Sequence, residues 1–525
     1  MSLNPLFAVR DFFFSMDFLT EEILMSIPVA ITSLCIFLVF GWVVYGVYTG
    51  KIGFSSMDKK VKIFLAILVV LAAVIRFSAP PKFGAAGGDE LFYVEVSEQV
   101  WSTGRYTVPE LVGQETVFFK PYYLYILLAA PLTGFLEPLV AGRILNIFLG
   151  SLTVLGVFFL AREFFGDDAG IAAGFLTVFL PLGIHLSHTT ETQVLSVLLM
   201  SFLIPVFKRY LEEESFFHGL GSVLLLASLV LTRSFNWIFV PVFGLILVFS
   251  KGFSGDDRVF YPIYLIVFGV LTFFSFLQNI EFGFREGGGE AGFFGFSNLV
   301  KNVSGLVPKF LDSFFYIPFV ALGLTGLVLS FKEKRSTWLL WVPLAVYTVS
   351  ITMYRYTIQA YPMPKFYYMT SVLLIPYAGN LFVKLFRTEK FRVFSVVLLV
   401  LIGFIGGLEA LGYDREMQTV VSQELVDYVE DNHPECGIVM YDGGPVRAVS
   451  DRVPLNIPHE EIDVDWYREN IGECIVYLRI ERVETENVRR FEENFDIGEP
   501  VYEREPVRGE FGRKVLGEVY RIELG

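Results

Sequence analysis

The sequence predicts a polytopic α-helical membrane protein with a small soluble α/β domain at its C-terminus. Its 525 residues are 54% hydrophobic and 16% aromatic, and 55 of them are Phe, a balance typical of chains in contact with lipid. Many windows of roughly 17 to 22 residues lack charge, as a hydrocarbon core about 30 Å thick requires of a spanning helix. After residue 412 strands are expected at 437–441 and 474–480 and helices near 418–432, 465–470 and 484–494, and this alternation indicates a sheet with covered faces.

Each long apolar run is expected to form one transmembrane helix, about 12 in all, with further interfacial helices. We divide the chain into an extra N-terminal transmembrane helix with a basic loop (1–60), a transmembrane domain (61–411) with an external loop (81–143), and the α/β domain (412–525). The runs lie at 28–48, 61–80, 144–161, 169–186, 191–207, 219–232, 236–250, 259–279, 313–331, 336–353, 366–386 and 393–411.

A further run at 121–139, interrupted by Pro131 and Gly134, decides the orientation. If this run does not cross, the basic clusters between spans all face the cytoplasm, as the positive-inside rule requires. We therefore interpret it as a re-entrant or interfacial helix. Both termini, the 81–143 loop and the C-terminal domain are then expected on the extracytoplasmic side of the plasma membrane. The basic clusters include Lys59 and Lys60, Arg162, Lys208 and Arg209, Lys332 and Lys334, and Lys384 and Arg387.

Charge and cysteine content narrow the function classes. The net charge is −14, and with no basic stripe in the sequence we expect no nucleic-acid partner. Cys35 lies in the first apolar run and is interpreted as a small core residue. Cys436 and Cys474 each open a strand-like run. They are expected either to form a disulfide, if the strands are neighbours in an oxidising compartment, or to remain two free thiols.

Two adjacent carboxylates, Asp89 and Glu90, follow two glycines at the exit of the second apolar run. Carboxylates at a membrane boundary are costly unless they are used, so Asp89 is a candidate general base that deprotonates an acceptor hydroxyl, with Glu90 beside it. The alternative is a helix cap, since Asp before an amphipathic run is a good N-cap residue. The two interpretations are compatible.

Cations at the same predicted face are candidates for binding phosphate. Lys120 precedes the aromatic run PYYLYILL and can bind a lipid phosphate or snorkel to the interface. Arg143 can bind the same group or anchor a span. Arg233, Arg355 and Lys365 lie at outer boundaries against the positive-inside trend, which favours an anionic ligand. The tyrosines around the last two fit an aromatic belt.

His185, His188 and Glu191 lie in the predicted external turn GIHLSHTTETQ. Glu191 is expected to be a second carboxylate of the site, and His188 a substrate-binding residue. Asp89, Glu191 and His188 together are a candidate site for a divalent cation, which is the one cofactor that the sequence suggests.

Several segments resemble the GT-C membrane glycosyltransferases, in the branch of the protein O-mannosyltransferases and aminoarabinose transferases. The similar segments occur in the family's order, and the resemblance is best over residues 85–190. They are GGDELFY, FKPYYLYILLAAP, GRILNIFLGSLTVLGVFFLAREFFGDDAGIAAG and YRYTIQAYPMPKFYYMTSVLLIP. Tyr122 stands where the family often has a second proline after Lys-Pro, and the Trp-Trp-Asp-Tyr-Gly signature of oligosaccharyltransferases is absent.

The resemblance implies an enzyme that transfers a sugar, with inversion, from a polyprenyl-phosphate donor to an extracytoplasmic protein, glycan or lipid acceptor. It also implies Asp89 as base, Lys120 near the lipid phosphate and Glu191 as the family's second external acid. Two other classes remain alternatives. A transporter or flippase would be expected to show related halves with charges near the midplane, and a non-catalytic receptor or assembly protein would not need acids in the first loop.

Overall fold

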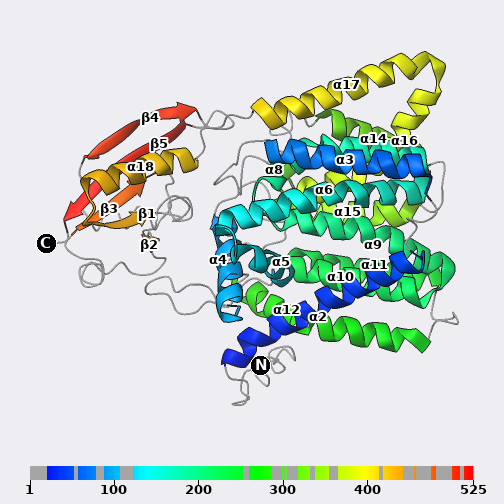
Figure 1. The fold of residues 1–525 in the computed structure, drawn as a ribbon, viewed down its shortest axis with the longest axis horizontal. Helices are drawn as coiled ribbons and strands as arrows, with labels where there is room; N and C mark the ends of the chain where they lie inside the picture. The colour runs from blue at the N-terminus through cyan, green and yellow to red at the C-terminus, as the bar shows by residue number, and fades with distance from the viewer. Residues whose placement is uncertain are drawn as a thin grey trace. The chain divides into compact units, whose positions relative to one another are not determined.

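The computed structural model describes two compact units, and each is taken by itself (Figure 1). The first comprises residues 1–80, 93–108 and 117–412, and the second comprises 81–92, 109–116 and 413–525. The residues described are 21–51, 57–78, 88–106, 122–251, 259–286, 298–300, 302–303, 317–331, 337–353, 365–412, 418–440, 455–456, 474–479, 499–508 and 514–523.

Helices account for nearly all of the described chain before residue 413. Helix α6 is the central element, since it packs against α3, α5, α7, α8, α9 and α16. The helices are α2 (Glu21–Tyr48), α3 (Lys59–Ser78), α4 (Gly88–Thr103), α5 (Tyr123–Thr133), α6 (Pro138–Phe165), α7 (Asp167–Val178), α8 (Pro181–Ser187), α9 (Gln193–Glu213), α10 (Phe216–Thr232), the 3-10 helix η1 (Ser234–Ile238), α11 (Phe239–Lys251), α12 (Tyr261–Glu286), α14 (Ile317–Ser330), α15 (Trp338–Met353), α16 (Tyr367–Arg387) and α17 (Glu389–Gly412).

Every apolar run expected to span the membrane overlaps a helix of the structure. Within the described residues, five helices are long and apolar enough to cross: α2, α3, α6, α9 and α16. The pair α7 and α8, bent by 56° at its break, counts as a sixth if it is one span. Six further apolar helices are shorter. A membrane protein of many spans is therefore supported, and the number of about 12 crossings stays a prediction.

The run at 121–139 does not form a spanning helix. Helix α5 has 11 residues, contains Pro131 and ends at Gly134. At 1.5 Å per residue it extends about 16 Å, roughly half of a hydrocarbon core about 30 Å thick. This length agrees with a re-entrant or interfacial helix.

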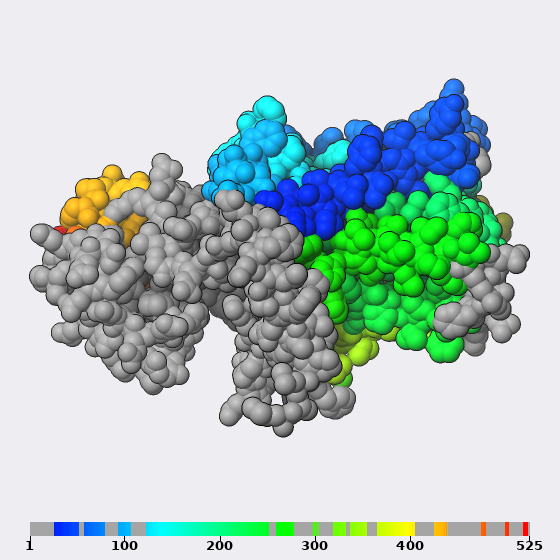
Figure 2. Space-filling view, turned by 90° about the horizontal axis from the view of Figure 1, so that it is seen from below, coloured from blue at the N-terminus to red at the C-terminus, as the bar shows by residue number. Residues whose placement is uncertain are grey.

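Helix α2 shows how the outer helices divide their surface between protein and lipid (Figure 2). It packs against α5, α10 and α12. Trp42 is buried, stacks on Phe217 and donates its indole N–H to the Phe217 carbonyl at 3.0 Å. Phe37 and Phe40 on the same helix are largely exposed. In a membrane such side chains contact acyl chains, so their exposure carries no penalty.

The second unit contains a five-stranded mixed sheet in the order β2-β1-β3-β5-β4. The strands β2, β1 and β3 are parallel neighbours, whereas β5 runs antiparallel to both β3 and β4. The strands predicted at 437–441 and 474–480 correspond to β1 and β3. The bounds are β1 (Gly437–Met440), β2 (Leu455–Asn456), β3 (Cys474–Arg479), β4 (Tyr502–Arg508) and β5 (Lys514–Glu523).

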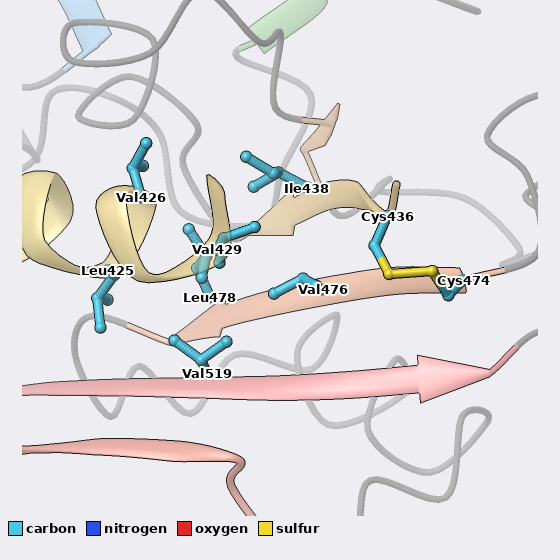
Figure 3. Close-up of a cluster of buried hydrophobic side chains, with 9 residues drawn as sticks. All are labelled: Leu425, Val426, Val429, Cys436, Ile438, Cys474, Val476, Leu478 and Val519. Atoms are coloured by element: carbon cyan, nitrogen blue, oxygen red, sulfur yellow. A yellow bond between two sulfur atoms is a disulfide. The ribbon is translucent and has the colours of Figure 1, made fainter. Parts of the chain in front are cut away.

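Helix α18 (Gln418–Asn432) covers one face of this sheet through Leu425, Val426 and Val429 (Figure 3). Cys436, just before β1, and Cys474, at the start of β3, form a disulfide. Because β1 and β3 are parallel neighbours, both cysteines lie at the same end of the sheet. The disulfide alternative for these two thiols is therefore confirmed, and the helices expected near 465–470 and 484–494 lie outside the described residues.

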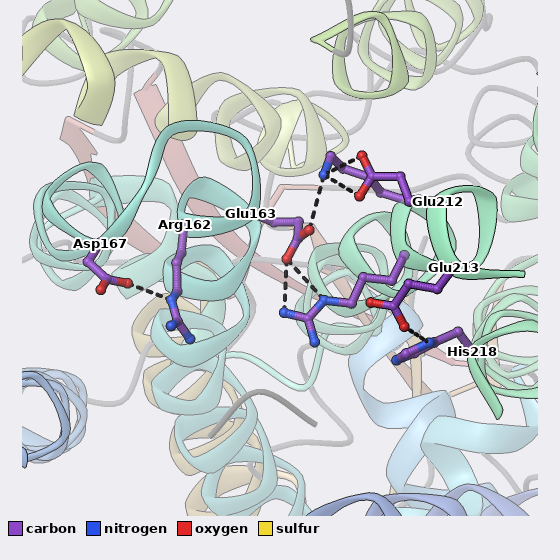
Figure 4. Close-up of polar contacts among 8 residues, drawn as sticks. Arg162, Glu163, Asp167, Glu212, Glu213 and His218 are labelled. Carbon is purple, nitrogen blue, oxygen red and sulfur yellow. Dashed lines mark hydrogen bonds and ion pairs between the residues drawn. The ribbon is translucent and has the colours of Figure 1, made fainter. Parts of the chain in front are cut away.

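A network of ion pairs joins the ends of α6 and α9 (Figure 4). Glu163 accepts hydrogen bonds from Lys208 at 3.1 Å and from Arg209 Nη2 at 3.0 Å, and Lys208 also pairs with Glu212 one helical turn away. These residues lie at the end of the helices that the positive-inside rule assigns to the cytoplasm. The side chains become more exposed along the network, from 9% at Lys208 to 55% at Glu212.

Candidate active site

The connection between α8 and α9, residues 188–192, carries Glu191 and is completely buried. Its backbone is not helical throughout, so its carbonyl groups need other donors in an apolar surrounding. Asn146 on α6 supplies them, since its Nδ2 donates to the Thr189 carbonyl at 2.6 Å and to the Glu191 carbonyl at 3.0 Å. One amide side chain thus holds the turn that presents Glu191.

Glu191 forms a buried ion pair with Lys365, which lies just before α16. The distance from Lys365 Nζ to Glu191 Oε1 is 2.6 Å, and the two side chains are 6% and 0% exposed. The partners are 174 residues apart in the sequence. A pair so far from solvent loses the hydration of both ions, and stability alone seldom explains it.

Arg233 joins this pair through Gln193. With its amide nitrogen toward the carboxylate, Gln193 donates to Glu191 Oε2 at 2.5 Å and accepts from Arg233 Nη1 at 2.9 Å. The same Arg233 nitrogen donates to Thr192 Oγ1 at 3.0 Å. Arg233 follows α10 with an extended backbone, φ −162° and ψ 135°, which turns the chain into η1. The result is one connected cluster of Glu191, Lys365, Gln193 and Arg233.

Two aromatic rings enclose the Arg233 guanidinium. Its Cζ lies 5.6 Å from the centre of the Tyr122 ring and 5.0 Å from that of Phe366. Both distances are within the range of cation–π attraction, which strengthens when the cation is desolvated. Tyr122 immediately precedes the short helix α5, so this helix contributes one wall of the cluster.

Arg143 and His188 are both buried near this turn. Arg143 lies one helical turn before Asn146 on α6, and residues three apart share a helix face. An arginine that anchors a span would reach the headgroup region, whereas Arg143 is buried within the protein. Its role, in binding the phosphate or in anchoring the span, stays a prediction. His188 follows the last residue of α8, and its backbone N–H donates to the His185 carbonyl.

Four of the expected site residues are not settled by the structure. Asp89 and Glu90 lie in the first turn of α4, which begins at Gly88, and their side chains lie outside the described residues. Lys120 and Arg355 lie outside the described residues altogether. Their roles stay predictions.

The described residues do not fit a divalent cation at Glu191. Both carboxylate oxygens accept hydrogen bonds, from Lys365 and Gln193, and an ammonium 2.6 Å away repels a metal ion. The part of the chain that the structure describes has one group of three clustered potential ligands, Glu435 with Cys436 and Cys474. Its two sulfurs form the disulfide.

Sequence reasoning found the charged members of the cluster and missed the neutral ones. Gln193 and Asn146 connect and hold the charges, and Tyr122 was noted as a departure from a family pattern rather than as a contact. Asn146 did leave a signal, since it is a polar residue one turn after Arg143 in an otherwise apolar helix.

Residues 121–277 match the family model described as dolichyl-phosphate-mannose-protein mannosyltransferase. This segment contains Tyr122, Arg143, Asn146, Glu191, Gln193 and Arg233, and therefore most of the cluster. No curated protein sequence matches the chain.

Solved structures share the fold at low sequence identity. The apo form of ArnT from Cupriavidus metallidurans has a TM-score of 0.55 at 12% identity, over 88% of this chain and 97% of that chain. ArnT bound to undecaprenyl phosphate has a TM-score of 0.52 at 12% identity, over 87% and 97%. The archaeal oligosaccharyltransferase AglB from Archaeoglobus fulgidus, in complex with an inhibitory peptide and a dolichol-phosphate, has a TM-score of 0.51 at 13% identity, over 80% and 70%.

These likenesses by themselves establish a common fold, which many functions can share. The family match at 121–277 overlaps two of the GT-C-like segments, FKPYYLYILLAAP and GRILNIFLGSLTVLGVFFLAREFFGDDAGIAAG. The fold shared with ArnT covers 88% of this chain. The matched segment makes residues 121–277 similar to the mannosyltransferase family, and the fold makes the chain similar to ArnT and AglB.

Proposed function

We propose that the protein transfers one sugar from a polyprenyl-phosphate donor to a protein, glycan or lipid acceptor on the extracytoplasmic side of the plasma membrane. The observation that carries this proposal is the buried cluster of Glu191, Lys365 and Arg233 beside the short helix α5. Two proteins of the same fold, ArnT and AglB, have been solved with undecaprenyl phosphate and with a dolichol-phosphate.

The cations of the cluster suit the phosphate of a lipid donor. Among the described residues the cluster contains two cations and one carboxylate. Preorganised cations in a site without water stabilise negative charge far better than cations in bulk solvent. The Lys365 ammonium acts as a point charge, and the guanidinium of Arg233 offers a planar fork. Both would stabilise the phosphate as it leaves the sugar.

Glu191 and Asp89 then have different tasks. Because Glu191 already accepts from Lys365 and Gln193, we assign it to holding the Lys365 ammonium in place. Asp89 remains the proposed general base, with Glu90 beside it in the first turn of α4. The acceptor hydroxyl gives its proton to Asp89, and its oxygen bonds to the anomeric carbon. The carbon–oxygen bond to phosphate breaks, its electron pair goes to the phosphate oxygen, and the configuration inverts.

The test is a transfer assay in membranes with radiolabelled polyprenyl-phosphate sugars of several kinds. Four forms are compared: the natural chain, Asp89→Asn, Glu191→Gln and the matched control Glu163→Gln. Glu163 is also a glutamate paired with a lysine, but it lies in the network at the other end of α6. Binding of the unsugared polyprenyl phosphate is measured in parallel.

We expect Asp89→Asn to lower turnover by about 100-fold or more while lipid phosphate still binds, because only the base is lost. Glu191→Gln is expected to lower both turnover and lipid-phosphate binding, whereas Glu163→Gln keeps both. Absence of transfer by the natural chain with every donor would contradict the proposal. A receptor, transporter or flippase would be indifferent to Asp89→Asn in this assay.

A further inference from the structure

Arg76 is a fully buried charge inside the apolar helix α3. Ionisable residues within a spanning helix are costly and need a compensating surrounding. Within the described part of the chain Arg76 forms no ion pair with a carboxylate, and it bonds to oxygens of neutral groups instead. These are the carbonyls of Ala72, Thr177 and Val178 and the Ser187 hydroxyl.

The contacts with Thr177 and Val178 lie at the break between α7 and α8. Pro181 begins α8, and a proline has no N–H to donate to the carbonyl four residues earlier, which is that of Thr177. Arg76 Nη2 donates to this carbonyl at 3.3 Å. The Leu180 N–H also donates to this carbonyl, at 3.4 Å, so Arg76 supplies a second donor in place of the one that Pro181 lacks, with its positive charge at the negative end of the α7 dipole.

A second contact reaches the other end of α8. Arg76 Nε donates to Ser187 Oγ at 3.1 Å, and Ser187 is the last residue of α8. Two glycines make room for this arrangement. A methyl group on Gly150 would lie 3.1 Å from Arg76 Nε and 2.2 Å from Ser187 Oγ, and one on Gly183 would lie 3.5 Å from Arg76 Nη2.

One guanidinium thus joins the end of α7 to the end of α8. The chain bends by 56° at the break, and Glu191 follows Ser187 by four residues. Asn146, which holds the Glu191 turn, and Gly150, which faces Arg76, lie one helical turn apart on α6. The Arg76 contacts and the Glu191 contacts are therefore built on the same stretch of α6.

We propose that Arg76 is a positioning residue, which sets the bend between α7 and α8 and thereby the orientation of Glu191. Its effect on sugar transfer rests on the function proposed above, whereas its effect on the bend does not. The two effects can be measured separately in the purified full-length chain.

The first measurement is a double-variant cycle of Arg76→Gln and Pro181→Ala, read as the melting temperature. The Pro181→Ala substitution restores a backbone N–H that can donate to the Thr177 carbonyl. Arg76→Gln should therefore lower the melting temperature much less when Pro181→Ala is present. Equal losses in both backgrounds would overturn the role of Arg76 at the break.

The second measurement is transfer by the same four proteins. Arg76→Gln should lower kcat by about 100-fold and also raise the KM for the donor, as is expected of Glu191→Gln, because a misplaced Glu191 no longer holds the Lys365 ammonium. Pro181→Ala should not restore kcat, because the regained hydrogen bond lets α7 and α8 straighten. Recovery of kcat together with the melting temperature would show that Arg76 acts through stability alone and would overturn the proposal.

Arg162→Gln is the matched control, since it removes a guanidinium from an ion pair with Asp167 at the other end of α6. It should leave kcat unchanged. If Arg76→Gln does not fold, Ser187→Ala replaces it and should lower kcat with only a moderate loss of melting temperature, because it removes one of the Arg76 contacts; unchanged kcat there would contradict the proposal. If the natural chain transfers no sugar, the proposed function fails, and the melting temperatures alone decide whether Arg76 holds the bend.

Discussion

Two groups of charges at opposite ends of the same helices differ in almost every respect. Near the start of α9, Glu191 and Lys365 are 0% and 6% exposed and come from segments 174 residues apart. At the end of α9, Lys208 and Glu163 are 9% and 15% exposed, and the network continues outward to Glu212 at 55%. Glu191 and Lys365 are enclosed by protein, whereas the network around Glu163 extends to the exposed side chain of Glu212.

The difference in burial distinguishes the candidate active site around Glu191 from the network around Glu163. In the network around Glu163 the side chains of Arg209 and Glu212 are 27% and 55% exposed, so solvent screens part of the pairing there, and its basic residues follow the positive-inside rule. The Glu191 group has lost its hydration, and an apolar replacement would serve stability as well. A buried ion pair among apolar helices therefore calls for a functional explanation.

The largest expected contrast is in stability. Lys365→Met removes the ammonium from a buried carboxylate and should lower the free energy of unfolding by about 3–5 kcal/mol. The counterpart Lys208→Met leaves Glu163 with its bonds to Arg209, so its loss should be clearly smaller. Denaturant unfolding in detergent measures both, and the double variant Lys365→Met with Glu191→Gln should recover much of the loss. Equal losses at the two ends would break the comparison.

An effect of intermediate size on donor binding is expected when Arg233 of the cluster is compared with Arg209 of the network around Glu163. Arg233→Lys keeps the charge but loses the planar guanidinium, whose Nη1 bonds both Thr192 and Gln193 and which lies between two rings. The loss of one charged hydrogen bond corresponds to roughly tenfold weaker donor binding. Arg209→Lys, in the network around Glu163, should not change donor binding. Titration with a polyprenyl phosphate measures donor binding by both variants. An effect of equal size at Arg209 would mean that the network around Glu163 also contacts the donor.

The smallest effect is expected at the most exposed pair. Arg387 and Asp168 are paired with side chains 70% and 62% exposed. Arg387→Gln should change the free energy of unfolding by less than about 1 kcal/mol, and the difference should vanish at high salt. Unfolding curves at two salt concentrations measure this. A loss as large as that of Lys365→Met would show that exposure does not rank these pairs.

Much of the fold could be predicted, because the apolar runs are a direct consequence of the lipid solvent. Each run overlaps a helix, and the proline and glycine at 131 and 134 marked the short helix α5. Of the candidate site, Glu191, Arg233 and Lys365 were found because a charge next to an apolar run stands out. The bonds among them were not predictable, since they join residues far apart in the chain.

The sequence by itself determined where the chain is apolar enough for lipid, where charge is confined to the ends of apolar runs, and which two cysteines open strand-like runs. Only the tertiary structure decided that Glu191 contacts Lys365, that Gln193 and Asn146 connect and hold the cluster, and that Arg76 replaces the donor missing at Pro181. The physical reason is that hydropathy is a property of each residue and its neighbours. Hydrogen bonds between distant neutral groups exist only once the helices have packed.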